Sequence, residues 1–249
     1  MRRIYTALAA AILTVAAVAG ATGCTRVKLA DNPATATHTL NKTVTLDGAT
    51  TLKTDIAMGV GELTLSGAEA SGTAMIGTFV YAPPSWLPEV AYSVEASTGT
   101  LSVRQPENSN TKIFDNVKNT WDVRIAKGIP TDLHLTLGVG RTSVDLRGVD
   151  VTALAVDSGI GETTLDLSGA RTTGFTGRID AGVGKLTLRL PRGVGARVTG
   201  GADGLGDFTA DGISVNSDSW VNDAWSGTGP KIDIALNRGI GEVAILLVD

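Results

Sequence analysis

The sequence has few of the residues from which catalytic and metal sites are usually built. Its 249 residues include one cysteine, two histidines and 4% aromatic residues. A single cysteine excludes an internal disulfide. His38 and His134 are distant in the sequence and too few for a histidine-based metal site. We therefore expect no metal site, no cofactor and no enzymatic activity.

Long hydrophobic runs and basic clusters are also missing. The apolar run Ile4–Ala19 is shorter than the roughly 20 residues that a membrane-spanning helix needs. It follows Arg2 and Arg3 and ends in small residues, which is typical of a secretory signal peptide. Without residues 1–24 the chain has 19 basic and 25 acidic residues, a net charge of −6. This charge argues against nucleic acid as a partner and against electrostatic binding to anionic lipid headgroups.

The single cysteine, Cys24, directly follows this segment. Ala21-Thr22-Gly23-Cys24 resembles the lipobox of bacterial lipoproteins, although that pattern prefers Leu where this chain has Ala21. The resemblance implies that Cys24 is lipidated, becomes the first mature residue and anchors the protein to the outer face of a bacterial membrane. An ordinary signal peptide that ends near a cysteine is the alternative.

The chain divides into three parts by composition. We expect a signal peptide (1–23), the lipidated cysteine with a polar tether (24–40) and a single domain (41–249). Glycine is abundant, with 31 residues, and Thr and Val recur. This composition is typical of many short strands joined by tight turns.

A Gly-apolar-Gly triplet recurs through the domain, between segments in which apolar and polar residues alternate. Such alternation predicts strands with one buried face. The middle four triplets are 21, 23 and 22 residues apart, and a fixed period of this length is typical of solenoids. The triplets are Gly59-Val60-Gly61, Gly138-Val139-Gly140, Gly159-Ile160-Gly161, Gly182-Val183-Gly184, Gly204-Leu205-Gly206 and Gly239-Ile240-Gly241.

At each triplet, the apolar residues that are expected to face inward switch between odd-numbered and even-numbered positions. Before Gly140 the apolar residues are odd-numbered, through Val139, and after it they are even-numbered. A one-residue slip would turn the strand inside out, so each triplet is predicted to be a corner where glycine supplies backbone freedom. The residues that follow successive triplets alternate in charge, which favours in-register stacking with ion pairs: Arg141, Glu162, Lys185 and Asp207. We predict an all-β, right-handed parallel β-solenoid built from repeats of about 22 residues.

Two insertions, 80–130 and 213–230, interrupt the period. Loops on a rigid scaffold often carry function, so a protein or glycan partner is expected at Trp220 and Trp225 in the second insertion. Packing of both rings in the core or a cap is the alternative. The first insertion contains apparent strands at 90–96, 100–104 and 121–126.

Two acidic motifs suggest other functions. Asp145 and Asp166 occupy equivalent outward positions, and a carboxylate pair could support glycosidase or lyase chemistry. Arg189 follows in the same column and offers Asp166 a simple ion pair, so a polysaccharide-active enzyme is the second choice. One imperfect copy of a calcium-binding nonapeptide, 200–208, includes Asp203 and Asp207.

Several of these units resemble the toast-rack or "putative adhesin" domain of bacterial envelope proteins. The resemblance covers about residues 40–249 and implies a cell-surface β-helical scaffold, with a binding or structural role in adhesion or envelope-stress sensing and no catalytic residues. The matching segments are Trp121-Asp122-Val123, 128–133, 137–140, 144–148, 158–161, 165–169, 186–191 and 240–243.

Overall fold

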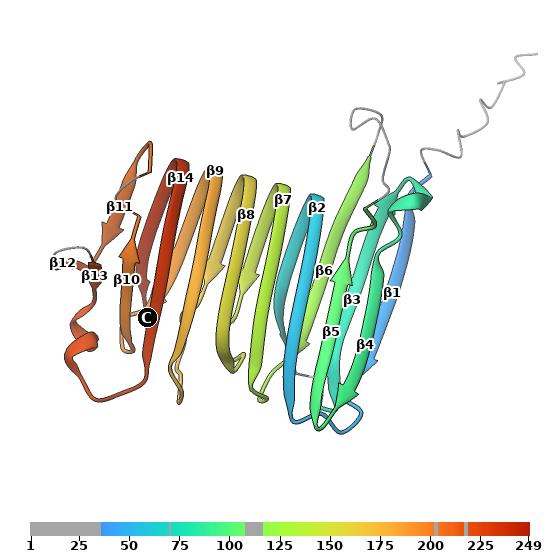
Figure 1. Cartoon of the computed structure of the whole chain (residues 1–249), viewed down its shortest axis with the longest axis horizontal. Helices are drawn as coiled ribbons and strands as arrows, with labels where there is room; N and C mark the ends of the chain where they lie inside the picture. Colours follow the sequence, from blue (N-terminus) through green and yellow to red (C-terminus); the bar gives the residue numbers. More distant parts are fainter. Residues whose placement is uncertain (1–35, 70, 108–116, 202–203, 217–218) are drawn as a thin grey trace, which may run out of the picture. The chain divides into compact units, whose positions relative to one another are not determined.

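The computed structural model describes residues 36–69, 71–107, 117–201, 204–216 and 219–249 (Figure 1). The predicted signal peptide, Cys24, most of the tether and Asp203 lie outside the described residues. No helix in the described part of the chain combines the length and hydropathy needed to cross a membrane.

The described residues form a single sheet of 14 strands, so the all-β prediction is confirmed. The main path through the sheet is β1-β3-β6-β2-β7-β8-β9-β14-β10-β13-β12, and β4, β5 and β11 pair beside it. The strands are β1 His38–Thr45, β2 Thr51–Ala68, β3 Thr73–Ala82, β4 Glu89–Glu95, β5 Thr98–Arg104, β6 Lys118–Ala126, β7 Thr131–Asp145, β8 Val151–Asp166, β9 Phe175–Pro191, β10 Gly195–Gly200, β11 Phe208–Asp211, β12 Ser214–Asn216, β13 Ser219–Val221 and β14 Lys231–Val248, with 3-10 helices η2 Pro84–Trp86 and η3 Asp223–Ser226.

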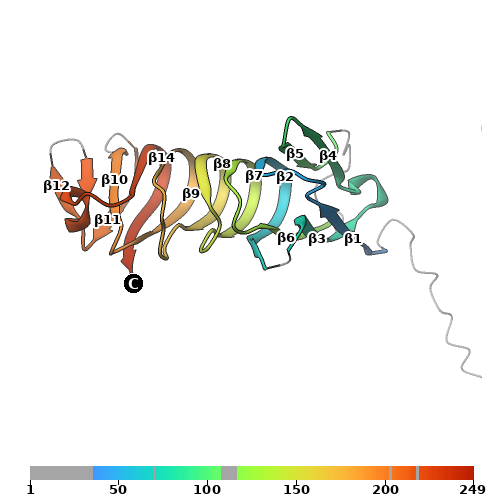
Figure 2. The ribbon, with the colours of Figure 1, turned by 90° about the horizontal axis from the view of Figure 1, so that it is seen from below.

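Five long strands, β2, β7, β8, β9 and β14, lie side by side and pair in parallel (Figures 1 and 2). Each contains one triplet, and the second glycines of the triplets are direct register partners. These partners are Gly61, Gly140, Gly161, Gly184 and Gly241. Equivalent residues of neighbouring strands therefore stack on one another, as the charge alternation predicted.

The parity switch at the triplets is confirmed by burial. Leu133 and Leu135, before the triplet of β7, are fully buried, as are Val144 and Leu146 after it. Val139, between them, is 49% exposed. The prediction that the inward face runs through Val139 is therefore wrong: the strand bends within the triplet, and the bend turns the middle side chain outward.

In β7, β8, β9 and β14 both glycines of the triplet are required by the close approach of backbones. A Cβ on Gly140 would lie 1.8 Å from the carbonyl oxygen of Gly61, and one on Gly159 would lie 2.3 Å from that of Gly138. The second glycine also has a φ of +146° in β7 and +137° in β8, a conformation that residues with a side chain rarely adopt.

The order of the last strands differs from the order of their sequence. The triplet at 204–206 was expected to stack on that at 182–184, but β14 lies between β9 and β10. Leu205 instead bridges Ile240 of β14. With 18 residues, β14 matches β9 along nearly its whole length, whereas β10 and β11 have only 6 and 4 residues.

The first insertion is largely part of the sheet. Its three predicted strands are confirmed as β4, β5 and β6, of which β5 and β6 pair with β2. Trp121 of β6 is fully buried and meets Phe79 edge to face at 5.5 Å. The sheet begins at His38, so residues 38–40, which were assigned to the tether, belong to β1.

Candidate functional site

The middle residues of the triplets form a row of aliphatic side chains across neighbouring strands, which we call the apolar ridge. It consists of the half-buried Val60 and the exposed Val139, Ile160, Val183, Ile240 and Leu205, in spatial order. In the described part of the chain, five of the eight exposed large hydrophobic residues belong to it, with exposed fractions of 46–68%. Contiguous exposed apolar surface on a soluble domain usually marks a contact site.

A row of charged side chains, the charged row, runs beside the ridge, one residue after each triplet. In spatial order it is Glu62, Arg141, Glu162, Lys185, Glu242 and Asp207. Arg141 Nε lies 3.0 Å from Glu162 Oε2, which confirms the predicted ion pair. Lys185 pairs at 2.8 Å with Glu242 of the inserted β14, and this hydrogen bond raises the pKa of Lys185. Asp207 follows Glu242, so it is not the neighbour of Lys185 that the sequence suggested.

The two tryptophans proposed for partner binding are half-buried and contact their own chain. The ring of Trp220 packs against that of Phe208, with centroids 4.5 Å apart. The ring of Trp225 has two cations near it, Arg197 at 4.6 Å and Lys231 at 4.8 Å from its centroid. Each ring therefore keeps some exposed surface while it also stabilises the end of the sheet.

Asn222 fixes the segment that carries these rings. Its side-chain oxygen accepts a hydrogen bond of 2.9 Å from Ala196 N, and its amide donates to the carbonyl oxygens of Pro191 and Val194 at 3.1 and 2.8 Å. Asn222 is 97% buried, given its exposed fraction of 3%. The tryptophan segment is thus held against the start of β10 rather than projecting as a free loop.

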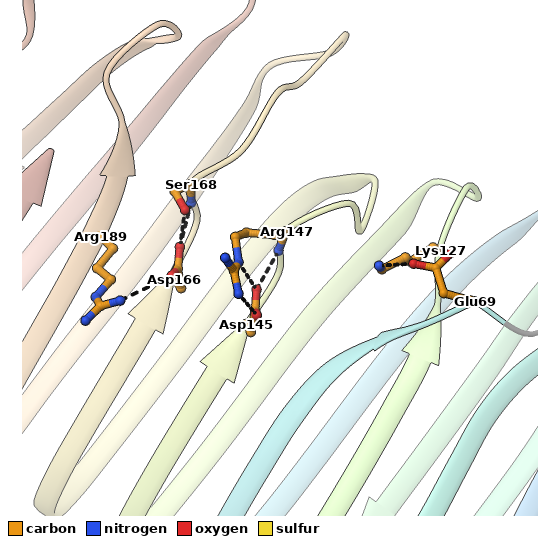
Figure 3. Close-up of polar contacts among 7 residues, drawn as sticks. All are labelled: Glu69, Lys127, Asp145, Arg147, Asp166, Ser168 and Arg189. Atoms are coloured by element: carbon orange, nitrogen blue, oxygen red, sulfur yellow. Dashed lines mark hydrogen bonds and ion pairs between the residues drawn. The ribbon is translucent and has the colours of Figure 1, made fainter. Parts of the chain in front are cut away.

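Asp145 and Asp166 are register partners, and each carboxylate is engaged by its own chain (Figure 3). Arg147 donates two side-chain hydrogen bonds to Asp145, at 2.9 and 2.6 Å. These bonds hold the pKa of Asp145 below its usual value. Asp166 accepts a hydrogen bond of 3.0 Å from Ser168 N and lies 3.8 Å from Arg189 Nη1, as the sequence suggested.

A second polar row crosses the sheet at His134, on the other side of the triplets. His134 Nδ1 lies 3.4 Å from Asp55, and its Nε2 lies 3.1 Å from Asp157. Arg178 donates to Asp157 at 2.9 Å and forms an ion pair with Asp180. The hydrogen bond with His134 is the main cause of a lowered pKa at Asp157. Within the described residues, no group of three His, Cys, Asp or Glu side chains is arranged to hold a metal ion.

Comparison with known proteins identifies the family. The model of the family described as the N-terminal domain of toast_rack, DUF2154, matches residues 17–189, more than half of the chain. The chain belongs to the toast-rack family. No curated protein matches it at a significant level.

One solved structure resembles this fold over most of the chain. A "putative cell adhesion protein" from Clostridium sporogenes is 26% identical, with a TM-score of 0.77 over 86% of this chain and all of the other. A "putative adhesin" from Bacteroides fragilis is 14% identical over 86% of this chain and 99% of the other, with a TM-score of 0.34. Only the first likeness is close enough to bear on the fold.

Sequence reasoning missed the apolar ridge of this toast-rack chain because it counted the middle residues as core. One signal was available. Six triplets all carry Val, Ile or Leu between two glycines, and side chains on the outside of a bend have no core to fill.

Proposed function

We propose that this protein is a lipid-anchored, non-enzymatic binding or structural module at the outer face of a bacterial membrane, acting in adhesion or envelope-stress sensing. The observation that carries the proposal is toast-rack membership together with the likeness to a "putative cell adhesion protein" of 26% identity. The engaged carboxylates of Asp145 and Asp166 support a surface that binds rather than one that catalyses.

The lipid anchor is supported by the sequence around Cys24. Cys24→Ala is expected to abolish labelling of the protein by radioactive palmitate and to move it from the membrane to the soluble fraction after cell lysis. Thr25→Ala is the matched control and should remain in the membrane. Unchanged processing and membrane association in Cys24→Ala would contradict the anchor.

We place the contact with a protein or glycan partner at Trp220 and Trp225, because both rings are half-exposed and the segment is fixed by Asn222. Exposed aromatic rings stack on sugar rings and anchor protein interfaces. Trp225→Ala is expected to reduce capture of envelope glycans or proteins by the full chain at least about tenfold, the range of an interface hot spot. Leu87→Ala, which removes an exposed apolar side chain at the far end of the sheet, is the control. Equal capture by all three proteins would exclude this surface.

A polysaccharide-active enzyme that uses Asp145 and Asp166 is the second candidate. A glycosidase needs a general acid with a raised pKa, whereas hydrogen bonds from Arg147 lower that of Asp145. We expect no release of reducing sugar from envelope polysaccharides by the wild-type chain. Activity that disappears in Asp145→Asn with Asp166→Asn would overturn the non-enzymatic proposal.

We also propose that the bent parallel strands are coils of a right-handed solenoid with the Gly-X-Gly triplet as its repeat. Parallel β-β connections are right-handed in almost all known proteins, which supports this hand. An experimental structure would test it directly, and left-handed connections between β7, β8 and β9 would contradict it.

A further inference from the structure

The apolar ridge has the geometry of a contact surface. Its six residues are register partners on adjacent strands, so at a strand spacing of about 4.8 Å the ridge is about 24 Å long. Glycines flank every ridge residue and add no side chain of their own. They line a shallow depression of about 20 Å³, room for about one water molecule, beside Val183 and Ile240. The ridge side chains therefore project from a backbone that carries no side chain immediately before or after them along each strand.

The charged row determines which surface would fit against this ridge. Its signs, from Glu62 to Asp207, are −, +, −, +, − and −. If the row is reversed and placed against itself, Glu162 faces a lysine, Lys185 faces a glutamate, and Arg141 and Glu242 face each other. The four central charges are thus complementary to their own reversed order. Only the outermost pair, Glu62 and Asp207, has the same sign.

We infer that the apolar ridge joins two copies of this chain, antiparallel, about a two-fold axis between β8 and β9. Ile160 packs on Val183 of the second copy, and Val139 packs on Ile240. A two-fold interface uses the same patch on both chains, so it closes without leaving a free ridge. This self-association goes beyond the proposed envelope role and uses a different surface from Trp220 and Trp225.

A second copy fits the charges better than a membrane does. The charged row holds four acidic and two basic residues, so anionic lipid headgroups would be repelled overall. Its alternating signs have no counterpart in a lipid surface, whereas charge complementarity between protein surfaces fixes partner and register.

Cross-linking at single introduced cysteines tests the arrangement. In the full chain expressed in bacterial cells, Ile160→Cys and Val183→Cys lie next to the axis, and a short bis-maleimide is expected to link two copies. Leu205→Cys, the most exposed ridge residue at 68%, would be offset from its own copy by about 24 Å and should not be linked. The wild-type chain controls for Cys24. Equal linking at Leu205→Cys, or none at Ile160→Cys and Val183→Cys, would overturn the antiparallel interface.

Sedimentation equilibrium of the purified full chain tests the energetics. Ile160→Thr with Val183→Thr keeps β-branched residues but removes apolar contacts, and each change counts twice in a two-fold dimer, so dimerisation should weaken about tenfold or more. Val94→Thr, an exposed valine on β4, should have no effect. Circular dichroism and thermal unfolding of each variant establish that it folds.

The like-charged outer pair gives a test in the opposite direction. Glu62→Lys makes the outermost pair attractive, so it should tighten the dimer, whereas the exposed Glu95→Lys on β4 should not. A wild-type chain that stays monomeric would overturn the proposal. So would a ridge that instead binds vesicles of phosphatidylglycerol and phosphatidylcholine, because the occupant would then be lipid.

Discussion

The two glycines of each triplet meet different physical requirements. In β7, β8, β9 and β14 the first is needed because the backbone of the neighbouring strand leaves no space for a Cβ, and the second because of both space and its positive φ. Neither requirement can be met by a local shift, since the atoms in the way are carbonyl oxygens of a paired strand. Glycine is therefore fixed by contacts between strands, in addition to the bend itself.

Gly161→Ala is expected to destabilise the protein by about 2–4 kcal/mol, from backbone strain and a clash with Gly140. The added Cβ would lie 1.9 Å from the Gly140 carbonyl oxygen at a φ of +137°. Gly193→Ala is the control, because nothing lies within 4 Å of its Cβ position, and it should change stability by less than about 0.5 kcal/mol. Urea unfolding followed by circular dichroism measures both, and equal stability of the two variants would contradict the explanation.

Asp157 should make stability depend on acidic pH. Its pKa is lowered in the folded protein, chiefly by the hydrogen bond with His134, so it contributes stability above its unfolded pKa of about 3.9 and loses it as the pH falls through the lower folded pKa. Asp157→Asn should therefore be less stable than wild type at pH 7, and the difference should shrink below about pH 3.9. Exposed Asp132→Asn controls for loss of a charge on β7. Urea unfolding across this range decides, and a difference that grows as the pH falls would contradict the assignment.

At the scale of elements, β2 is the first of the bent strands and needs a cap. β5 pairs with Thr51–Ala57 and β6 with Glu62–Ala68, so its bend has no strand on that side. Gln105 Oε1 accepts hydrogen bonds from Gly59 N and Val60 N at 2.9 and 3.0 Å. Asn119 donates to the carbonyl oxygen of Val60 at 2.6 Å. Two side chains thus replace the backbone partners that a neighbouring bend would supply.

Asn119→Ala is expected to lower the free energy of unfolding by about 2–3 kcal/mol, because it leaves buried polar groups without partners. One of these is Trp121 Nε1, which donates to Asn119 at 2.7 Å. Asn41→Ala, which removes an exposed hydrogen bond with Thr78, should have an effect below about 0.5 kcal/mol. Thermal unfolding of the two variants gives the comparison. Similar losses in both would show that the cap contributes little.

Local sequence patterns predicted the strands and their stacking well. The alternation of apolar and polar residues predicted the buried faces on both sides of the triplets, which the structure confirms. The opposite charges of Arg141 and Glu162 predicted their ion pair, which is also confirmed. The exposure of Val139 could not be predicted by counting parity, because parity does not say where within a triplet the chain bends. The caps Gln105 and Asn119 also escaped prediction, because they act on residues about 45 to 59 positions away.

At the scale of the whole sheet, the strand order shows the limit of reading units in sequence. Neighbouring units in the chain were expected to be neighbours in space, which holds for β7, β8 and β9. It fails for β14, which follows β13 in the sequence but pairs with β9, where Ile232 lies opposite Phe175. β14 is long enough to pair with nearly all of β9, whereas β10 and β11 are not, and no single unit reveals this. The surroundings of Trp220 and Trp225 were also hidden from the sequence, because both rings contact residues distant in the chain. The partner site at these two rings remains a proposal.

A chain that ends at Pro230 should lose the ordered structure of β10–β13 as well as β14, because β14 lies between β9 and β10 in the sheet. Ile179, Leu186 and Leu188 of β9 are buried and would lose their neighbour, and β10 would lose its parallel partner. Limited proteolysis should then cut readily between residues 192 and 230. A chain without Asp249, which within the described residues makes an exposed ion pair with Arg192, is the control and should resist like wild type. Equal resistance of the two shortened chains would contradict an essential β14.

The interior place of β14 also sets the timing of folding. An exported polypeptide crosses the membrane with its N-terminal part first, so on the proposed outer face β2, β7, β8 and β9 can pair one after another as they appear. The segment of β10 to β13 cannot reach its final position until β14 has emerged and paired with β9. During that interval the exposed edge of β9 is a template for any other extended chain. Completion of the sheet therefore waits on residues 231–248.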